Sequence, residues 1–411
     1  MGRKLHHVRQ IAVKAESTPG TEETSFAVGD LVRVRDLTIE QNPQYFERPV
    51  HTRSWGYTPR RQENTWCEIS FAVELTGHTG NTGGTWANSP VFSRLLAACG
   101  LEEVAVYDVD VGAISGGPFI HGEVISDNPS SPTEAAICVG RYYTGVSKIY
   151  VEDLTVGTSF TAGIEGGSSG ATATAGTEDG DAQAGLAWVP DTDSTATATI
   201  RFRNDGDEIQ VYGCRGDVTI DCQSQDIALL RFTIQGIYSE TVSQAMIQDF
   251  LPGAYPEQTP PTFVDAALAL TGSDGSSWAV ADLNFTEAQF SIGNNVTMRQ
   301  NSNSSSGWLA AHIAQRTPNG RFNPDDPNAA TYNLREKFKD NVQFALSTSW
   351  GSTEGNSFMV QAPAIELDSV GDGERDELST FDLSFRCTRG FDAGADGNQV
   401  GFDNELILFN L

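Results

Sequence analysis

A tripeptide between two cysteines is the first candidate for a functional site in this chain. Arg215-Gly216-Asp217 is the sequence that adhesion receptors bind, and Cys214 and Cys222 stand on either side of it. In a secreted protein these cysteines could close a disulfide loop. The N-terminus, however, has no apolar run typical of a secretory signal, and a chain made in the cytosol keeps its thiols reduced. We therefore interpret the tripeptide as part of a β-hairpin-like unit, lying between two strands, and not as an adhesion site.

Patterns that could support catalysis or metal binding are weak. Residues 166–170 match G-x-S-x-G, but a nucleophile elbow needs a strand before it and a helix after it, and this stretch is of low complexity. The histidines and cysteines lack the spacing of metal ligands. Acidic clusters at 191–193, 204–208 and 372–377 do not fit a calcium loop, and turn chemistry explains them, with a calcium site as the alternative. We predict no enzyme activity, no cofactor and no metal site.

Composition predicts a globular, strongly acidic protein. The chain has 411 residues, of which 39% are hydrophobic, so it can build real cores. Its 26 Lys and Arg face 54 Asp and Glu, a formal net charge of −28. Such a surface repels nucleic acid and anionic membranes, which excludes a basic binding protein. Because no segment approaches 18 consecutive apolar residues, we expect no membrane anchor.

Short apolar runs that alternate with polar residues predict strands along most of the chain. The clearest are 67–77, 227–239 and 377–387, and a hairpin is expected between 197–204 and 207–214 across Asn204-Asp205-Gly206. Helix signals occur at 89–100 and 331–342. In the first, Ser89 is the candidate N-cap and Gly100 the stop. The predicted class is mainly β, with two tandem β-sandwich or barrel domains and one or two short packed helices.

A proline-rich stretch at 249–262 is expected to be a linker between a first domain, 1–248, and a second domain, 263–411. A stretch rich in Gly, Ala and Thr at 163–185 is interpreted as a mobile surface loop. The two parts echo each other, since each ends in a strand, a polar turn and a strand with three alternating apolar residues. This echo favours an internal duplication.

The order of several segments resembles siphophage-type tail tube proteins, also called major tail proteins. "IAVKAESTPGTEET" is similar to the family's opening strand, Glu and Pro-Gly-Thr turn. "CEISFAVELTGHTGNTGGTWANSPVFSRLLAACGLEE" resembles its long strand, glycine-rich turn and helix. "QVYGCRGDVTIDCQSQDIALLRFTIQGIYSE" resembles its strand pair, and "NVTMRQNSNSSSGWLAAHIAQRTPNG" and "NELILFNL" resemble its second half. The length of the 163–185 stretch and the acidity depart from the pattern.

The resemblance implies a virion structural protein, made in the host cytoplasm, whose copies form stacked rings. The tail so built is the conduit for genome ejection. Its partners would be other copies of itself, the tape measure, tail terminator and tail tip proteins, and duplex DNA that passes through the lumen without specific binding. The duplication favours a homotrimer with a pseudo-hexameric ring over a true hexamer. An acidic bore would let the charged duplex slide, whereas a basic bore would grip it.

Stacking of rings needs an arm, and the best candidate is the polar stretch 41–64 between two strands. Exposed aromatics and arginines are the residue types that anchor interfaces. Arg35 and Arg48 stand beside or within this stretch and could also pair with carboxylates of a neighbouring ring. The alternative is an ordinary hairpin with two core aromatics. The predicted inter-ring residues are Tyr45, Phe46, Arg53, Trp55, Tyr57, Arg60 and Arg61.

Two other classes stay open at this point. One is another virion decoration, capsid-associated or surface-layer β protein, which would not assemble into tubes. The other is a secreted carbohydrate-binding or hydrolytic sandwich, which would need a signal peptide and a cleft with paired carboxylates. The scattered Trp86, Trp188, Trp308 and Trp350 favour core or interface positions over a sugar platform.

Overall fold

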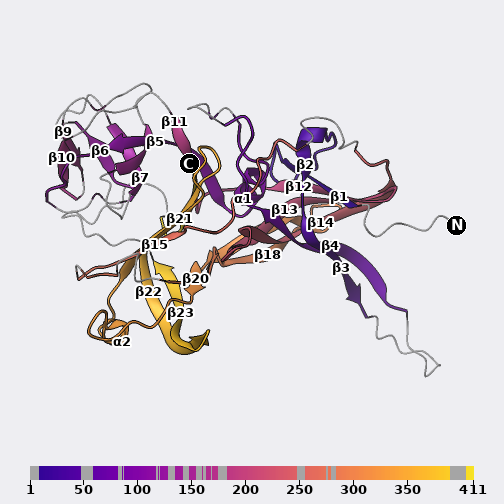
Figure 1. Ribbon diagram of the computed structural model, residues 1–411. Coiled ribbons are helices and arrows are strands. Elements are labelled where there is room, and N and C mark those ends of the chain that lie inside the picture. Colours follow the sequence, from indigo (N-terminus) through magenta and orange to yellow (C-terminus); the bar gives the residue numbers. More distant parts are fainter. Residues whose placement is uncertain are drawn as a thin grey trace.

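The computed structural model is built almost entirely from antiparallel strands (Figure 1). Its described residues contain two α-helices, α1 (Ser93–Ala98) and α2 (Leu334–Lys339), and one short 3-10 turn, η1 (Val28–Asp30). The predicted mainly β class is therefore confirmed. The residues that the structure describes are 9–47, 59–81, 86, 88–116, 119, 121–127, 135–141, 148–153, 160, 163–167, 169–174, 183–247, 255–274, 276–278, 284–388 and 404–411.

The first half of the chain forms one unit of paired strands around α1. β1 pairs with β2 and β12, β12 with β13, β13 with β14, β14 with β4, and β4 with β3. Across one sheet the order is thus β3-β4-β14-β13. The strands are β1 (Arg9–Ala15), β2 (Leu31–Val32), β3 (Arg35–Phe46), β4 (Arg61–Glu74), β12 (Ala198–Asn204), β13 (Asp207–Gln223) and β14 (Leu229–Ser243).

The second half repeats this arrangement around α2. β15 pairs with β16 and β21, β21 with β22, β22 with β23, β23 with β20, and β20 with β17. Each of these ladders has its counterpart in the first half, which agrees with the internal duplication that the sequence predicts. The strands are β15 (Ala267–Gly272), β16 (Ser277–Trp278), β17 (Glu287–Ser291), β20 (Asn319–Phe322), β21 (Phe344–Trp350), β22 (Phe358–Arg375) and β23 (Leu378–Thr388).

The two halves are joined by a direct ladder between β13 and β17, in which Ile220 faces Phe290 and Thr219 faces Ser291. One sheet therefore runs β3-β4-β14-β13-β17-β20-β23-β22 through both halves. β17 pairs only with the C-terminal part of β13, because β12 already occupies the same edge of β13 over its N-terminal part. The strand that follows β17 therefore cannot continue this ladder. Instead β18 (Asn294–Gln300) and β19 (Trp308–Arg316) form a separate two-stranded hairpin that packs against β13 and β14.

A further lobe, which the sequence does not predict, is inserted between α1 and β12. It lies at the opposite end of the molecule from the β3–β4 hairpin (Figure 1). Its core includes Phe119, Ile125 and Ile149, and β11 and β24 connect it to β22. Its strands and the closing strand are β5 (Leu101–Asp110), β6 (Val124–Ser126), β7 (Ala135–Arg141), β8 (Lys148–Asp153), β9 (Gly163–Gly166), β10 (Thr172–Thr174), β11 (Gln183–Pro190) and β24 (Ile407–Asn410).

Part of the stretch expected as a mobile loop, 163–185, is strand. β9 and β10 pair with each other, and β11 begins at Gln183. The composition misleads because small residues suit a compact lobe as well as a loop: Ile164 and Ala173 are both buried in its core. The segment described at 255–262 lies against the first half, where Gln258 donates its backbone N–H to the Gly77 carbonyl.

Local expectations hold in part. The β12–β13 hairpin turns at Asp205 and Gly206, both with positive φ, as the Asn-Asp-Gly sequence predicts. Helix α1 starts at Ser93, not near Ser89, because the Ser89 hydroxyl binds the Glu103 carboxylate and caps no helix. Gly100, with φ of +77°, ends it as predicted.

The Arg-Gly-Asp tripeptide lies inside β13, not between two strands. Arg215 is buried and donates from Nη2 to the Ser194 carbonyl at 2.8 Å, and Gly216 faces Ile234 across the ladder. All six cysteines are buried. Burial raises the pKa of Cys67 to about 12, so this thiol stays protonated and inert.

Candidate assembly surfaces

The sheet shared by the two halves has one apolar and one polar face. On the apolar face Phe71, Phe232, Val218, Phe290 and Leu383 are buried in the main core. The opposite face is polar because successive side chains of a strand alternate between the two faces. One row of directly facing residues crosses all eight strands, and in strand order it reads Arg35, Ala72, Arg231, Thr219, Ser291, Asn319, Arg386, Glu366.

This polar face carries more carboxylates than guanidinium groups at its half-buried and exposed positions. Arg231 bonds Asp221 at 2.8 Å and Arg386 bonds Asp368 at 2.6 Å, so two of its arginines are already neutralised within the chain. Thr219 donates to the Ser291 hydroxyl at 3.3 Å across the joint between the halves. The remaining carboxylates on the face include Glu40, Glu68, Glu287 and Asp382.

The sheet is unpaired at both of its ends among the described residues. β3 pairs with β4 alone, and residues 366–375 of β22 pair with β23 alone. An unpaired edge offers a row of backbone donors and acceptors to another strand. A single chain therefore presents two such edges, one from each half.

The predicted inter-ring arm is the far end of the β3–β4 hairpin, which projects from the body (Figure 1). Tyr45 and Phe46 are 53% and 51% exposed, so they are not the core aromatics of the alternative interpretation. The Arg60 guanidinium lies 3.4 Å from the Glu47 carboxylate and 5.9 Å from the centre of the Tyr45 ring. Arg61 faces Phe46 across the ladder. These residues lie together on one hairpin, and their contact with a second ring stays a prediction.

The other residues named for this arm are placed differently. Arg48, Arg53, Trp55 and Tyr57 lie outside the described residues. Arg35 stands at the base of the hairpin and bonds the Glu74 carboxylate of its own chain.

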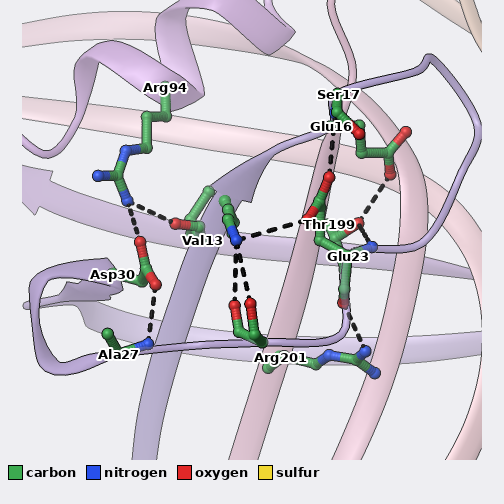
Figure 2. A network of polar contacts seen from close by, with 11 residues as sticks. Val13, Glu16, Ser17, Glu23, Ala27, Asp30, Arg94, Thr199 and Arg201 are labelled. Carbon is green, nitrogen blue, oxygen red and sulfur yellow. Dashed lines mark hydrogen bonds and ion pairs between the residues drawn. The ribbon is translucent and has the colours of Figure 1, made fainter.

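The segment after β1, with the sequence "AESTPGTEET", is fixed by its glutamates (Figure 2). The Glu16 carboxylate accepts hydrogen bonds from the Thr197 and Thr199 hydroxyls at 2.5 and 2.9 Å. It also accepts from the backbone N–H groups of Gly20 and Gly213 at 2.7 and 2.6 Å. The half-buried Glu16 carboxylate thus closes the Pro-Gly-Thr turn and links it to β12 and β13.

Two arginines complete this network. Arg201 is buried, forms an ion pair with the Glu22 carboxylate at 2.8 Å and donates a hydrogen bond to the Glu23 carbonyl at 2.8 Å. Arg94 of α1 bonds Asp30 at 2.6 Å and the Val13 carbonyl at 3.1 Å (Figure 2). The sequence marks this stretch only as a family motif, and the spacing of its glutamates was the signal that could have predicted their role.

The G-x-S-x-G match at 166–170 does not form a nucleophile elbow. The Ser169 hydroxyl donates to the buried Glu123 carboxylate, and the segment that follows is strand β10, not the helix that a nucleophile elbow requires. No group of three or more His, Cys, Asp or Glu in the described part of the chain could hold a metal ion. None of its helices is long and apolar enough to cross a membrane.

Comparison with known protein families identifies the family of this chain. The family model described as phage tail tube protein matches residues 7–387, which is nearly the whole chain. This chain therefore belongs to the phage tail tube protein family. A search of curated proteins finds no match. Family membership makes the chain a structural protein of the phage tail, and implies a structural and not an enzymatic role.

Proposed function

We propose that three copies of this chain close into a ring, and that stacked rings form the conduit for genome ejection. The observation that supports this is the eight-stranded sheet, which both halves build in the same order and which is open at each end. Identical copies joined head to tail, edge to edge, leave no open edge when the ring closes.

The duplication favours three copies over six. Each half supplies four strands in the same order, so one chain brings two equivalent units to a ring. Three chains therefore give six equivalent units, whereas six chains would double the circumference. The ring thus has exact threefold symmetry and pseudo-sixfold symmetry, because each of its three identical chains consists of two similar halves.

The polar face of the sheet lines the channel. Duplex DNA carries one negative charge per about 1.7 Å of its axis, and a basic wall would bind it. The guanidinium groups of Arg231 and Arg386 are held by Asp221 and Asp368, and the same face carries further carboxylates such as Glu40 and Glu287. The duplex thus passes without specific binding, which suits a conduit.

The remaining surfaces serve the rest of the tail. The β3–β4 hairpin reaches the next ring through Tyr45, Phe46 and Arg60, and the tube meets tape measure, tail terminator and tail tip proteins. Synthesis takes place in the host cytoplasm before assembly into the virion.

Electron microscopy of the purified protein, over a range of concentration and salt, tests this function. We expect hollow tubes of stacked rings, and averages of single rings with threefold symmetry. Rings of six chains would contradict the trimer, while closed shells or flat lattices would contradict the tube.

A further inference from the structure

The contact between the two halves, called here the joint, shows what covers the edge of β13 and the end of α1. On one side stand β13, its turn to β14, and the end of α1. The turn donates the Ser224 N–H to the Thr286 carbonyl at 2.7 Å, and Ile227 bridges to Thr262. On the ladder itself Ile220 and Phe290 face each other, both buried.

The end of α1 is covered by the base of the β18–β19 hairpin. The Asn294 side chain donates to the Cys99 carbonyl at 2.7 Å, and the Ile313 side chain lies against Gly100. Cys99 and Gly100 are both buried. The first half therefore receives three things from the second: strand β17, the segment before it, and the base of its hairpin.

The equivalent surface of the second half has no cover among the described residues. Over 366–375, β22 pairs with β23 on one side and with no described strand on the other, and Leu378, which corresponds to Ile227, is 60% exposed. At the end of α2, Phe338 is 39% exposed, and Asp340 and Asn341 are exposed where Cys99 and Gly100 are buried. The described residues contain no further unit of this kind that could supply the cover.

We infer that a second copy of this chain covers this surface, with β3 on the edge of β22 and the base of its β3–β4 hairpin on the end of α2. This inference rests on the proposed function, and it names the joint by which the ring closes. β3 corresponds to β17 and the β3–β4 hairpin to β18–β19, so the first half of the second copy carries the matching parts.

Strand direction agrees with this pairing. Every neighbouring pair in the eight-stranded sheet is antiparallel, so β3 and β22 at its two ends run in opposite directions. When identical copies are related by rotation about a ring axis, β3 of one copy meets β22 of the next as an antiparallel pair.

Charge selects this pairing over its alternatives. Two β22 edges placed together would bring Asp372 and Glu374 of one copy against those of the other, and like charges that face each other are unfavourable. β3 instead begins at Arg35, which pairs with the Glu74 carboxylate of its own chain, and follows the exposed Arg33, which lies 3.8 Å from the Glu257 carboxylate. The surface therefore fits a first half better than it fits another second half.

The register follows from the core positions that the halves share. Ile234 and Phe385 are equivalent, since each is the third of three alternating apolar residues on its strand, and their neighbours along the row are Ile39 and Phe290. In the β13–β17 ladder Thr219 faces Ser291. Gly371 is the equivalent of Thr219 and Glu40 the equivalent of Ser291, so the same register places Gly371 opposite Glu40 of the second copy.

Paired cysteines test this register. The double variant Gly371→Cys with Glu40→Cys should, on oxidation or with a short thiol-bridging reagent, give a covalent product of three chains in a denaturing gel. A Cβ at Gly371 meets nothing closer than 3.4 Å, so the substitution fits. The matched control is Asp372→Cys with Glu40→Cys, because a shift of one residue turns the side chain to the other face. Each single variant reports the background of native thiols.

The outcomes separate this inference from the function on which it rests. If tubes form but the control pair links and the Gly371 pair does not, the joint is wrong and the tube stands. If the wild-type chain forms no tubes, the proposed function itself fails.

A second variant tests the apolar contact. Leu378→Asp should prevent ring formation while leaving the thermal midpoint of the monomer unchanged, because the side chain is exposed in the single chain. Ile114→Asp, at an exposed position of the inserted lobe, is the matched control and should assemble normally. Normal assembly of Leu378→Asp would overturn the inference.

Discussion

The two halves of this protein have the same strand order but different surroundings. In the first half the outer edge of β13 and the end of α1 are covered by the second half. In the second half the outer edge of β22 and the end of α2 are open. A duplicated chain thus converts one of two equivalent joints into an intramolecular contact and leaves the other for a partner.

The residues at the two joints differ accordingly. The internal joint carries Ile220 against Phe290. The position equivalent to Ile220 is Asp372, which bonds Arg335 of α2. A charged residue keeps the open edge soluble before assembly, which an unpaired strand requires.

The largest effects on stability are expected in the core that the two halves share. Phe71 and Phe322 occupy equivalent positions, 3% and 2% exposed. Phe71→Ala and Phe322→Ala should each lower the free energy of unfolding by about 3–5 kcal/mol. Urea titrations followed by circular dichroism measure it. Because one sheet joins the halves, each variant should shift a single transition. Two transitions, only one of which moves in each variant, would show that the halves unfold separately.

A buried ion pair distinguishes the first half from the second. Glu208 bonds Arg203 at 2.5 Å with both side chains buried, whereas the corresponding hairpin of the second half begins with Trp350 opposite Phe358. Glu208→Gln leaves the Arg203 charge buried without its counter-ion and should cost about 3 kcal/mol of unfolding free energy. The same titration measures it, with the exposed Glu374→Gln as the control. An equal, negligible effect of both variants would contradict the role of the pair.

The joint between the halves should also make stability depend on pH, by a smaller amount. Burial raises the pKa of Asp217, whose carboxylate accepts the Asn294 N–H at 2.8 Å, and its equivalent in the second half is Ser369. Since the folded pKa lies above the unfolded value of about 3.9, stability is fully present below that value and falls as pH rises through the folded pKa.

Thermal melts between pH 4 and pH 7 measure this dependence. Asp217→Asn keeps an acceptor for the Asn294 N–H but cannot ionise, so its melting temperature should fall less with pH than that of the wild type. Ser369→Asn is the control and should keep the wild-type slope. A variant with the full wild-type slope would exclude Asp217 as the group responsible.

Much of this molecule was determined by the sequence alone. The alternation of Leu230, Phe232 and Ile234, and of Phe381, Leu383 and Phe385, predicts strands with one buried face because side chains on a strand alternate. The Asn-Asp-Gly turn predicts the β12–β13 hairpin, since its residues tolerate positive φ. The repeated order of segments likewise indicated the duplication.

Which strand edges are left without a partner depends on the tertiary structure. The charged Asp372 stands on β22 where β13 has Ile220, but this local difference does not say which strand is missing, because pairing depends on strands far away in the chain. The inserted lobe was missed because small residues satisfy a packed lobe and a loop equally well. Glu16 acquires its role only when Thr199 and Gly213, nearly 200 residues away, are brought beside it. Sequence thus fixes which face of a strand is apolar, while long-range pairing fixes which strand it meets.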